Sequence, residues 1–356
     1  MHRSPFRAIL IALILVVGSV AVAACGSDDN SSTSTSGGSA AAGSTSTAAA
    51  AKKIKVGLVT DIGGLNDRSF NALANKGLND AKSQLGVDGR VLISKSNADY
   101  VPNLTTLAQQ KYDLVIAVGF LMGDATEKVA GKFPDTKFAI IDSSAAGMKS
   151  KPTNVEGLLF SEQEAGYLVG YLSGLYAKDN NVTTIGSVGG QKIPPVDHYI
   201  AGYQAGAKKA DPGIKTLNGY SQDFVDQAKC KEIGLDQISK GSKVVFQVAG
   251  QCGLGALDAA KEKSAQGIGV DADQGYLGAH IMTSAEKKVD VAVETAIKAA
   301  QDGSIKGGTN TTFDLTNDGV GYGKPNAEGA KYESQVQEVA DKIKSGEITD
   351  IPDTVK

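Results

Sequence analysis

From residue 54 onward, short apolar runs alternate with longer segments in which apolar residues recur at helical spacing. Segment 69–85 shows the helical pattern, since its apolar residues fall on one face: Phe70, Leu73, Ala74, Leu78, Ala81 and Leu85. The short runs predict strands at 54–60, 90–94, 113–118, 137–142, 182–188, 214–219, 243–248 and 267–270. The segments between them predict helices at 69–85, 101–111, 122–132, 161–177, 196–210, 223–240 and 254–265. This alternation is typical of parallel sheets covered by helices.

The number of strands favours two sheets over one very large sheet. Four predicted strands precede residue 155 and four follow it, which indicates two doubly wound α/β lobes. The end of the chain predicts a helix at 285–302, a hairpin of 312–315 with 319–322, and a helix at 327–345.

We expect the chain to cross between the lobes near 156–160, 280–285 and 305–315, as in a multi-crossing hinge. The N-terminal lobe is then 52–157 plus 284–308. The C-terminal lobe is 158–283 plus 309–356.

The first residues have the pattern of an export signal. His2, Arg3 and Arg7 precede an apolar stretch, and Val22-Ala23-Ala24-Cys25 resembles a bacterial lipobox. This implies a lipoprotein signal peptide at 1–24 and a Cys25 that carries a diacylglycerol and palmitate anchor. The alternative is an uncleaved transmembrane anchor at the lower limit of spanning length.

Residues 25–51 are rich in Ser, Thr, Gly and Ala, which predicts a flexible tether that starts at the anchor. The rest of the chain would then stand on the extracytoplasmic face of the cell membrane.

Composition and charge argue against several classes of function for this protein. The net charge of -3 gives no basic surplus for nucleic acid. No Cys/His cluster suggests a metal site, and we expect neither metal nor cofactor. Cys230 and Cys252 are expected on the same rim of the second sheet, so we expect a disulfide if their Cα spacing allows one. The alternative is two unrelated small apolar residues.

Carboxylates and aromatic residues follow the predicted strands. Asp61 and Asp67 follow the first strand, Asp142 the fourth and Asp271 the eighth, while Phe70 and Phe224 stand at expected helix starts. Ligands of open parallel sheets bind at the carboxyl ends of strands, so these side chains should share one cleft. Carboxylates suit hydroxyl donors such as a sugar or ribose, and aromatic rings suit a flat ring.

Four blocks resemble the basic membrane lipoprotein family, the nucleoside-binding lipoproteins of ABC importers: TDIGGLNDRSFNALANKGL, VFQVAGQCGLG, GIGVDADQ and TSAEKKVDVAVE. The resemblance implies a periplasmic-binding-protein type I-like fold and a nucleoside ligand, with a purine base expected. It also implies delivery to ABC permease subunits served by a separate ATPase, and we expect a monomer.

The resemblance also implies roles for individual residues. Phe70 and Phe224 would stack on the two faces of the base, with Asp61 and Asn66 beside its edge. Asp271 and Lys287 would hold the ribose together with Asp142. The full expected set of ligand-binding residues is Asp61, Asn66, Asp67, Phe70, Asn71, Gly119, Asp142, Phe224, Gly250, Asp271 and Lys287.

Other readings stay open for several of these residues. Asn66 or Asp67 could cap the following helix, and the two phenylalanines could be core residues. Lys287, expected on a helix, could be a solvated charge. We expect no enzyme, because the sequence has neither a nucleophile elbow nor a phosphate-binding loop. Rival functions are a receptor for a sugar or another small polar solute, a sensory lipoprotein of the same fold, and an enzyme that acts on nucleosides.

Overall fold

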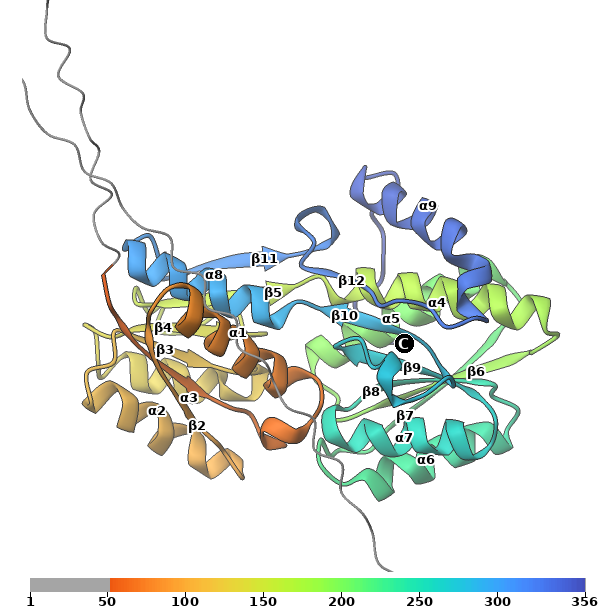
Figure 1. Cartoon of the computed structure of the whole chain (residues 1–356), viewed down its shortest axis with the longest axis horizontal. Helices are drawn as coiled ribbons and strands as arrows, with labels where there is room; N and C mark the ends of the chain where they lie inside the picture. The colour runs from red at the N-terminus through yellow and green to blue at the C-terminus, as the bar shows by residue number, and fades with distance from the viewer. Residues whose placement is uncertain (1–51, 356) are drawn as a thin grey trace, which may run out of the picture. The chain divides into compact units, whose positions relative to one another are not determined.

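The computed structural model describes residues 52–355, which fold into two α/β lobes (Figure 1). The expected signal peptide, lipidated Cys25 and tether lie outside the described residues. Residues 50–356 form one compact unit, and the sheets and hydrophobic core described here lie within 52–355.

The first lobe has a six-stranded parallel sheet in the order β11-β5-β4-β3-β1-β2. Its strands are β1 (Lys55–Val59), β2 (Asp88–Leu92), β3 (Leu114–Ala117), β4 (Lys137–Ile141), β5 (Val155–Phe160) and β11 (Thr309–Phe313). The central strands are continuous apolar runs because helices cover both faces of the sheet.

The second lobe repeats this plan in the order β12-β10-β9-β8-β6-β7. Its strands are β6 (Thr184–Gly189), β7 (Lys215–Tyr220), β8 (Val244–Val248), β9 (Gln266–Asp271), β10 (Ile281–Lys287) and β12 (Val320–Tyr322). Only β12 departs from the expected parallel arrangement, since it pairs antiparallel with β10.

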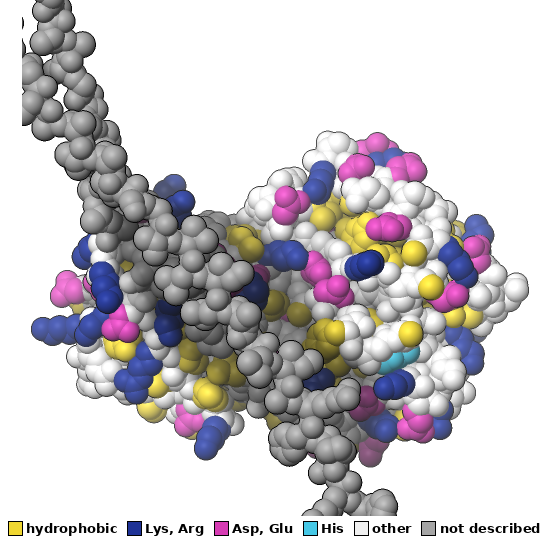
Figure 2. Space-filling model, in the orientation of Figure 1, with side chains coloured by type: hydrophobic (Ala, Val, Ile, Leu, Met, Phe, Trp, Pro, Cys, Tyr) yellow, Lys and Arg dark blue, Asp and Glu magenta, His cyan; other side chains and the backbone are white. Residues whose placement is uncertain are grey.

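Helices cover the two sheets. They are α1 (Phe70–Gln84), α2 (Tyr100–Gln109), α3 (Gly123–Ala130), α4 (Glu162–Asp179), α5 (Pro194–Ala210), α6 (Gln227–Ser239), α7 (Gly250–Glu262), α8 (Val289–Asp302) and α9 (Glu333–Lys344). On the face shown in Figure 2, basic and acidic side chains are interspersed over both lobes.

A glycine seam lets α4 and α5 pack with their backbones close together. A Cβ at Gly170 would lie 2.7 Å from the carbonyl carbon of Tyr203, and one at Gly206 would lie 2.8 Å from the amide nitrogen of Tyr171. Only glycine permits this approach.

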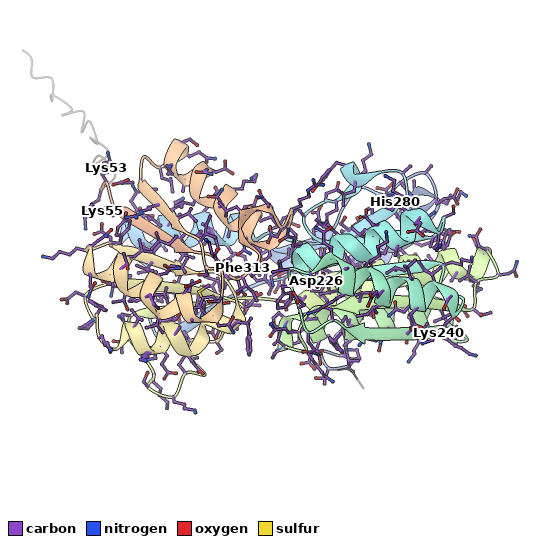
Figure 3. The ribbon with its side chains drawn as sticks, turned by 90° about the horizontal axis from the view of Figure 1, so that it is seen from below. Lys53, Lys55, Asp226, Lys240, His280 and Phe313 are labelled. Atoms are coloured by element: carbon purple, nitrogen blue, oxygen red, sulfur yellow. A yellow bond between two sulfur atoms is a disulfide. The ribbon has the colours of Figure 1, made fainter. Side chains whose placement is uncertain are left out.

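Within residues 52–355 the chain crosses between the lobes three times: from β5 to α4, from β10 to α8, and from β11 to β12. Figure 3 shows Phe313, the last residue of β11, on the side of the first lobe that faces the second. The crossings differ in detail from those expected. Residues 158–160 and 309–313 lie in strands of the first sheet, and 284–287 lie in β10 of the second sheet.

The expected hairpin of 312–315 with 319–322 is wrong. Its two arms lie in different sheets, because β11 pairs with β5 and β12 pairs with β10. Asp318 does adopt the left-handed conformation typical of such a turn, with φ 56°. The turn therefore redirects the chain from one lobe to the other.

Two further strands were not expected. In β5, Glu156 and Gly157 interrupt the apolar run, and in β10 polar residues follow Met282. These strands lead into crossings, so Lys287 ends a strand instead of lying on a helix.

A disulfide joins Cys230 of α6 to Cys252 of α7, with their Cα atoms 5.6 Å apart. Both residues lie in the first turn of their helices, and both are buried. The bond therefore ties the two helix starts together at the rim of the second sheet.

Candidate functional site

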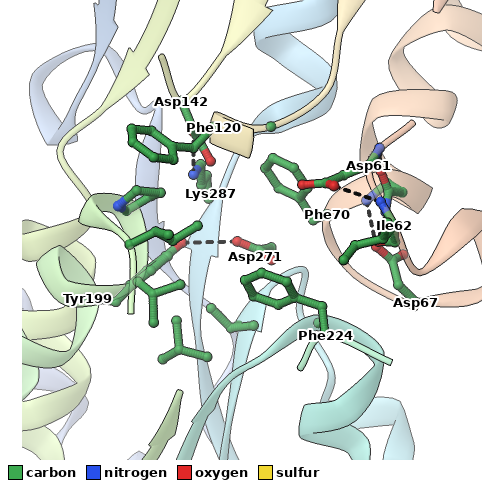
Figure 4. Close-up of a pocket in the computed structure, with 18 of the residues that line it drawn as sticks. Asp61, Ile62, Asp67, Phe70, Phe120, Asp142, Tyr199, Phe224, Asp271 and Lys287 are labelled. Carbon is green, nitrogen blue, oxygen red and sulfur yellow. Dashed lines mark hydrogen bonds and ion pairs between the residues drawn. The ribbon is translucent and has the colours of Figure 1, made fainter. Parts of the chain in front are cut away.

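A pocket lies between the two lobes, at the carboxyl ends of their strands (Figure 4). Its empty volume, which includes space open to solvent, is about 630 Å³. Its walls come from the loop after β1 and the start of α1 on one side, and from α5, α7 and the ends of β8 and β9 on the other.

Asp67 and Asn71 fix the first wall. The Asp67 carboxylate accepts hydrogen bonds from the backbone amides of Ser69 at 3.2 Å, Asn71 at 2.7 Å and Ala72 at 3.0 Å. The Asn71 side-chain oxygen accepts the Asp61 amide at 2.9 Å. Asp67 thus caps α1, and Asn71 positions the loop that carries Asp61.

Asp61 is the acid of this wall that is turned toward the ligand space. Its Oδ1 accepts the Ile62 amide at 2.7 Å and the hydroxyl of Tyr100, while its Oδ2 faces Gly119. Burial raises the pKa of Asp61 to about 6. A Cβ at Gly119 would lie 2.6 Å from this oxygen, so glycine there leaves room for the carboxyl group.

Phe70 and Phe224 contribute aromatic rings to the pocket from opposite lobes. Phe70 begins α1, whereas Phe224 lies in the loop before α6. The Phe224 ring sits against Gly190, where a Cβ would come within 2.5 Å of it. The amide of Cys252 donates to the Phe224 carbonyl at 3.0 Å, so the disulfide-bonded helix start holds this loop.

Lys287 is the centre of a buried charge cluster at the inner end of the pocket. Its Nζ lies 2.6 Å from Asp142 and 2.8 Å from Glu162. It also lies over the rings of Phe160 at 4.8 Å and Phe70 at 5.2 Å. Burial alone would favour the neutral amine, but the surrounding carboxylates outweigh it and raise the pKa of Lys287 above its ordinary value.

The two lobes contribute equivalent carboxylates to the pocket. Asp142 follows β4 and Asp271 ends β9, and both are left-handed, with φ of 67° and 60°. Asp271 accepts a hydrogen bond from the Tyr199 hydroxyl at 3.3 Å. Burial raises the pKa of Asp271 to about 7 and that of Asp142 to about 6.

The cluster reaches solvent through His198. Its Nδ1 lies 3.0 Å from Glu162, and its side chain is half-buried. Burial opposes protonation, but Glu162 raises the pKa of His198 above its ordinary value. Lys287 and His198 in turn overcome the burial of Glu162 and lower its pKa.

The structure brings together most of the residues singled out in the sequence. The pocket is lined by Asp61, Asp67, Phe70, Asn71, Gly119, Asp142, Phe224, Gly250, Asp271 and Lys287. Asn66 is the exception: it is exposed and lines a neighbouring cavity with Arg68 and Leu65. Left-handed Gly63 and Gly64 start a short turn that directs Asn66 outward and Asp67 inward.

Sequence reasoning missed Tyr199 and Glu162. Glu162 is the first residue of α4, the position that Phe70 has in α1, and this was the available signal. Tyr199 lies in the second turn of α5, where no such signal marked it. Among residues 52–355, no group of three or more His, Cys, Asp or Glu side chains could hold a metal ion. In the same range, no helix has the length and apolarity needed to cross a membrane.

Two α/β lobes with a pocket between their strand ends are the architecture of solute-binding proteins, as in the solved structure described below. Residues 54–354 match the model of the Bmp family, described as ABC transporter substrate-binding protein PnrA-like. The chain belongs to this family, which is a family of substrate-binding proteins and not of enzymes.

Relatives of known sequence or structure agree with this assignment. An uncharacterised lipoprotein of Pyrococcus abyssi is 38% identical over 82% of this chain and 74% of its own length. The "ABC transporter nucleoside-binding protein BmpA" of Lactococcus lactis is 33% identical over 83% of this chain and 88% of its own. A solved ABC transporter solute-binding protein from Aeropyrum pernix K1 is 29% identical, with a TM-score of 0.76 over 84% of this chain and 94% of its own.

Proposed function

We propose that this protein binds a nucleoside in the pocket between its lobes and delivers it to an ABC permease. The observation that carries the proposal is the pairing of two aromatic rings from opposite lobes with a carboxylate-rich inner end in one pocket. The name of the Lactococcus lactis relative supports the same ligand class.

In this proposal the base lies between Phe70 and Phe224, and Asp61 accepts a hydrogen bond from its edge. The ribose hydroxyls donate to Asp271 and Asp142, while Lys287 balances the charge of these acids. A carboxylate left without a donor in the closed pocket would cost roughly 1–3 kcal/mol, so ligands without hydroxyls are disfavoured. A phosphate would meet several acids, which disfavours nucleotides.

Asp67 and Asn71 have a different part in the proposal. Their polar atoms are engaged by the loop and by α1, so they shape the wall and hold Asp61. Gly119 and Gly250 provide space for Asp61 and for the backbone beside Phe224.

We also propose that Cys25 carries a lipid and that the domain stands on the extracytoplasmic face of the membrane. The lipobox at Val22–Cys25 and the lipoprotein name of the Pyrococcus abyssi relative support this placement. The disulfide between Cys230 and Cys252 also supports it, because such bonds persist in oxidising compartments. A permease and a separate ATPase would complete the importer.

Calorimetric titration of residues 52–356 tests the ligand assignment. The protein is unfolded and refolded to remove carried-over ligand, then titrated with adenosine, guanosine, inosine, cytidine and uridine. Saturable heat with one or more nucleosides is expected, with AMP and ribose as weak-binding controls. A folded sample that gives no heat with all five nucleosides would refute the nucleoside assignment.

A further inference from the structure

One hydrogen bond joins the two lobes at a place away from the three crossings of the chain. The Gln274 side-chain amide, on the loop after β9, donates to the backbone carbonyl of Arg68, before α1, at 3.3 Å. Within residues 52–355 no other hydrogen bond spans the lobes away from the three crossings and the Lys287 cluster. This hydrogen bond can therefore form only when the two lobes are close together.

The Gln274 side chain is held in position from within the second lobe. It is fully buried, and its Oε1 accepts the Gln247 side-chain amide at 2.8 Å and the Val270 amide at 3.2 Å. Its backbone amide donates to the Ser284 hydroxyl at 2.9 Å. With its oxygen engaged on both sides, the side chain presents its NH₂ group to the first lobe.

Glycines make room for this buried amide pair. A Cβ at Gly269 would lie 2.8 Å from the Gln274 Oε1, and a Cβ at Gly253 would lie 2.5 Å from the Gln247 side-chain carbonyl carbon. Burying polar amides has a desolvation cost that apolar side chains would avoid. The bonds to Gln247 and Val270 use only the side-chain oxygen of Gln274, whereas the partner of its NH₂ group is the Arg68 carbonyl in the first lobe.

The acceptor is set by the backbone of the first lobe. Arg68 has φ 58°, a left-handed conformation that is uncommon for a residue with a side chain. Its side chain is exposed, so the contact with Gln274 depends on the Arg68 carbonyl and not on the guanidinium group. The strained residue stands between Asp67 and Phe70, and thus belongs to the loop that forms the pocket wall.

We propose that Gln274 is a positioning residue that latches the closed lobes together through the Arg68 carbonyl. Gln274 lies three residues after Asp271, and the Val270 amide that precedes Asp271 bonds to its side chain. The latch therefore connects the ends of the two pocket walls. It does not depend on which solute the pocket holds.

The distance between the lobes measures the latch directly. Spin labels on Lys132→Cys and Lys240→Cys, two exposed positions on different lobes, give a distance distribution for ligand-free residues 52–356. Gln274→Met removes the donor at nearly constant volume, together with the Oε1 that accepts from Gln247 and Val270, so the Arg68 variants described next test the bond between the lobes alone. Gln274→Met is expected to lower the ratio of closed to open molecules roughly fivefold, the effect of one ordinary hydrogen bond. Ser284→Ala is the matched control: it disturbs the same buried turn but keeps the amide, so the ratio should stay at its wild-type value.

A second pair of variants tests the latch from the first lobe, where no core residue is changed. Arg68→Val disfavours the left-handed φ because valine is β-branched, which turns the carbonyl away, and it should open the lobes as Gln274→Met does. Arg68→Asn keeps both the carbonyl and a tolerance for left-handed φ, and should match the wild type. The latch is overturned if wild type shows no closed population, if Gln274→Met or Arg68→Val keeps the wild-type ratio, or if Ser284→Ala or Arg68→Asn opens the lobes equally.

Discussion

At the scale of single residues, Asp271 combines burial with a place on the pocket wall. Its pKa is raised to about 7, so its contribution to folding stability is present at low pH and is lost as pH rises through 7. In the proposed complex, ligand hydroxyls donate to the ionised form of Asp271. The nucleoside affinity should therefore weaken as pH falls from 8 to 6, whereas the contribution of Asp271 to folding stability grows over the same range.

Replacing Asp271 shows how much of this pH dependence of nucleoside affinity comes from Asp271 and how much from the other acids of the pocket. Asp271→Asn should weaken binding by about 10- to 100-fold, because a hydrogen bond to a charged group is worth roughly 1.5–3 kcal/mol. The remaining affinity should vary less with pH between 6.5 and 8. Titration calorimetry in two buffers of different ionisation enthalpy measures both the affinity and the proton release. Equal pH dependence in the two proteins would show that another group is responsible.

At the scale of elements, the α4–α5 seam depends on glycine. Gly170→Ala would place a methyl group against the Tyr203 backbone and should destabilise the protein by about 1–3 kcal/mol or more. Gly213→Ala is the control, since its nearest neighbour would be Asp211 Oδ1 at 3.5 Å. Denaturant unfolding of both variants measures the difference. Equal stability would mean that α4 and α5 separate without cost.

The loop that carries Phe224 depends on the disulfide behind it. The double variant Cys230→Ala/Cys252→Ala should lower the free energy of unfolding by about 2–4 kcal/mol. It should also weaken nucleoside binding, because the Cys252 amide that holds the Phe224 carbonyl lies in the tied helix start. Both quantities are measured at a temperature where the variant is fully folded. Wild-type affinity in the folded variant would limit the disulfide to a role in stability.

The elements differ in how well the sequence predicts them. Strands β1, β3 and β4 are continuous apolar runs, so their positions could be predicted within a few residues. Strands β5 and β10 could not, because polar residues and glycine interrupt them near the crossings. The pocket acids could be predicted, since parallel strands end at one edge.

The outward direction of Asn66 could not be predicted in the same way. It follows from left-handed backbone at Gly63 and Gly64, which the residue pattern alone does not determine. The contact of Gln274 with Arg68 could not be predicted from the sequence for a related reason. Its acceptor is a backbone carbonyl far away in the sequence, and no side-chain motif marks it.

At the scale of the whole molecule, the Lys287 cluster lies where the lobes join. Lys287 ends β10 at one crossing, Glu162 begins α4 at another, and Asp142 comes from the first sheet. One buried cation thus neutralises acids from both lobes. Removing one partner from a buried ion pair typically costs about 3–5 kcal/mol, because the other charge stays buried.

Lys287→Met should therefore destabilise the protein, and more strongly at pH 8 than at pH 5.5. Without the lysine, the pKa values of Asp142 and Asp271 rise further above their unfolded values. Protonation at low pH then restores stability, which is lost again as pH rises. Lys76→Met is the control: this exposed lysine pairs with Asp80 and Asp290, and its loss should cost at most about 1 kcal/mol. Thermal unfolding at the two pH values measures the stability of both variants. If Lys287→Met loses the same stability at pH 5.5 as at pH 8, Lys287 does not balance the charge of the acids from the two lobes.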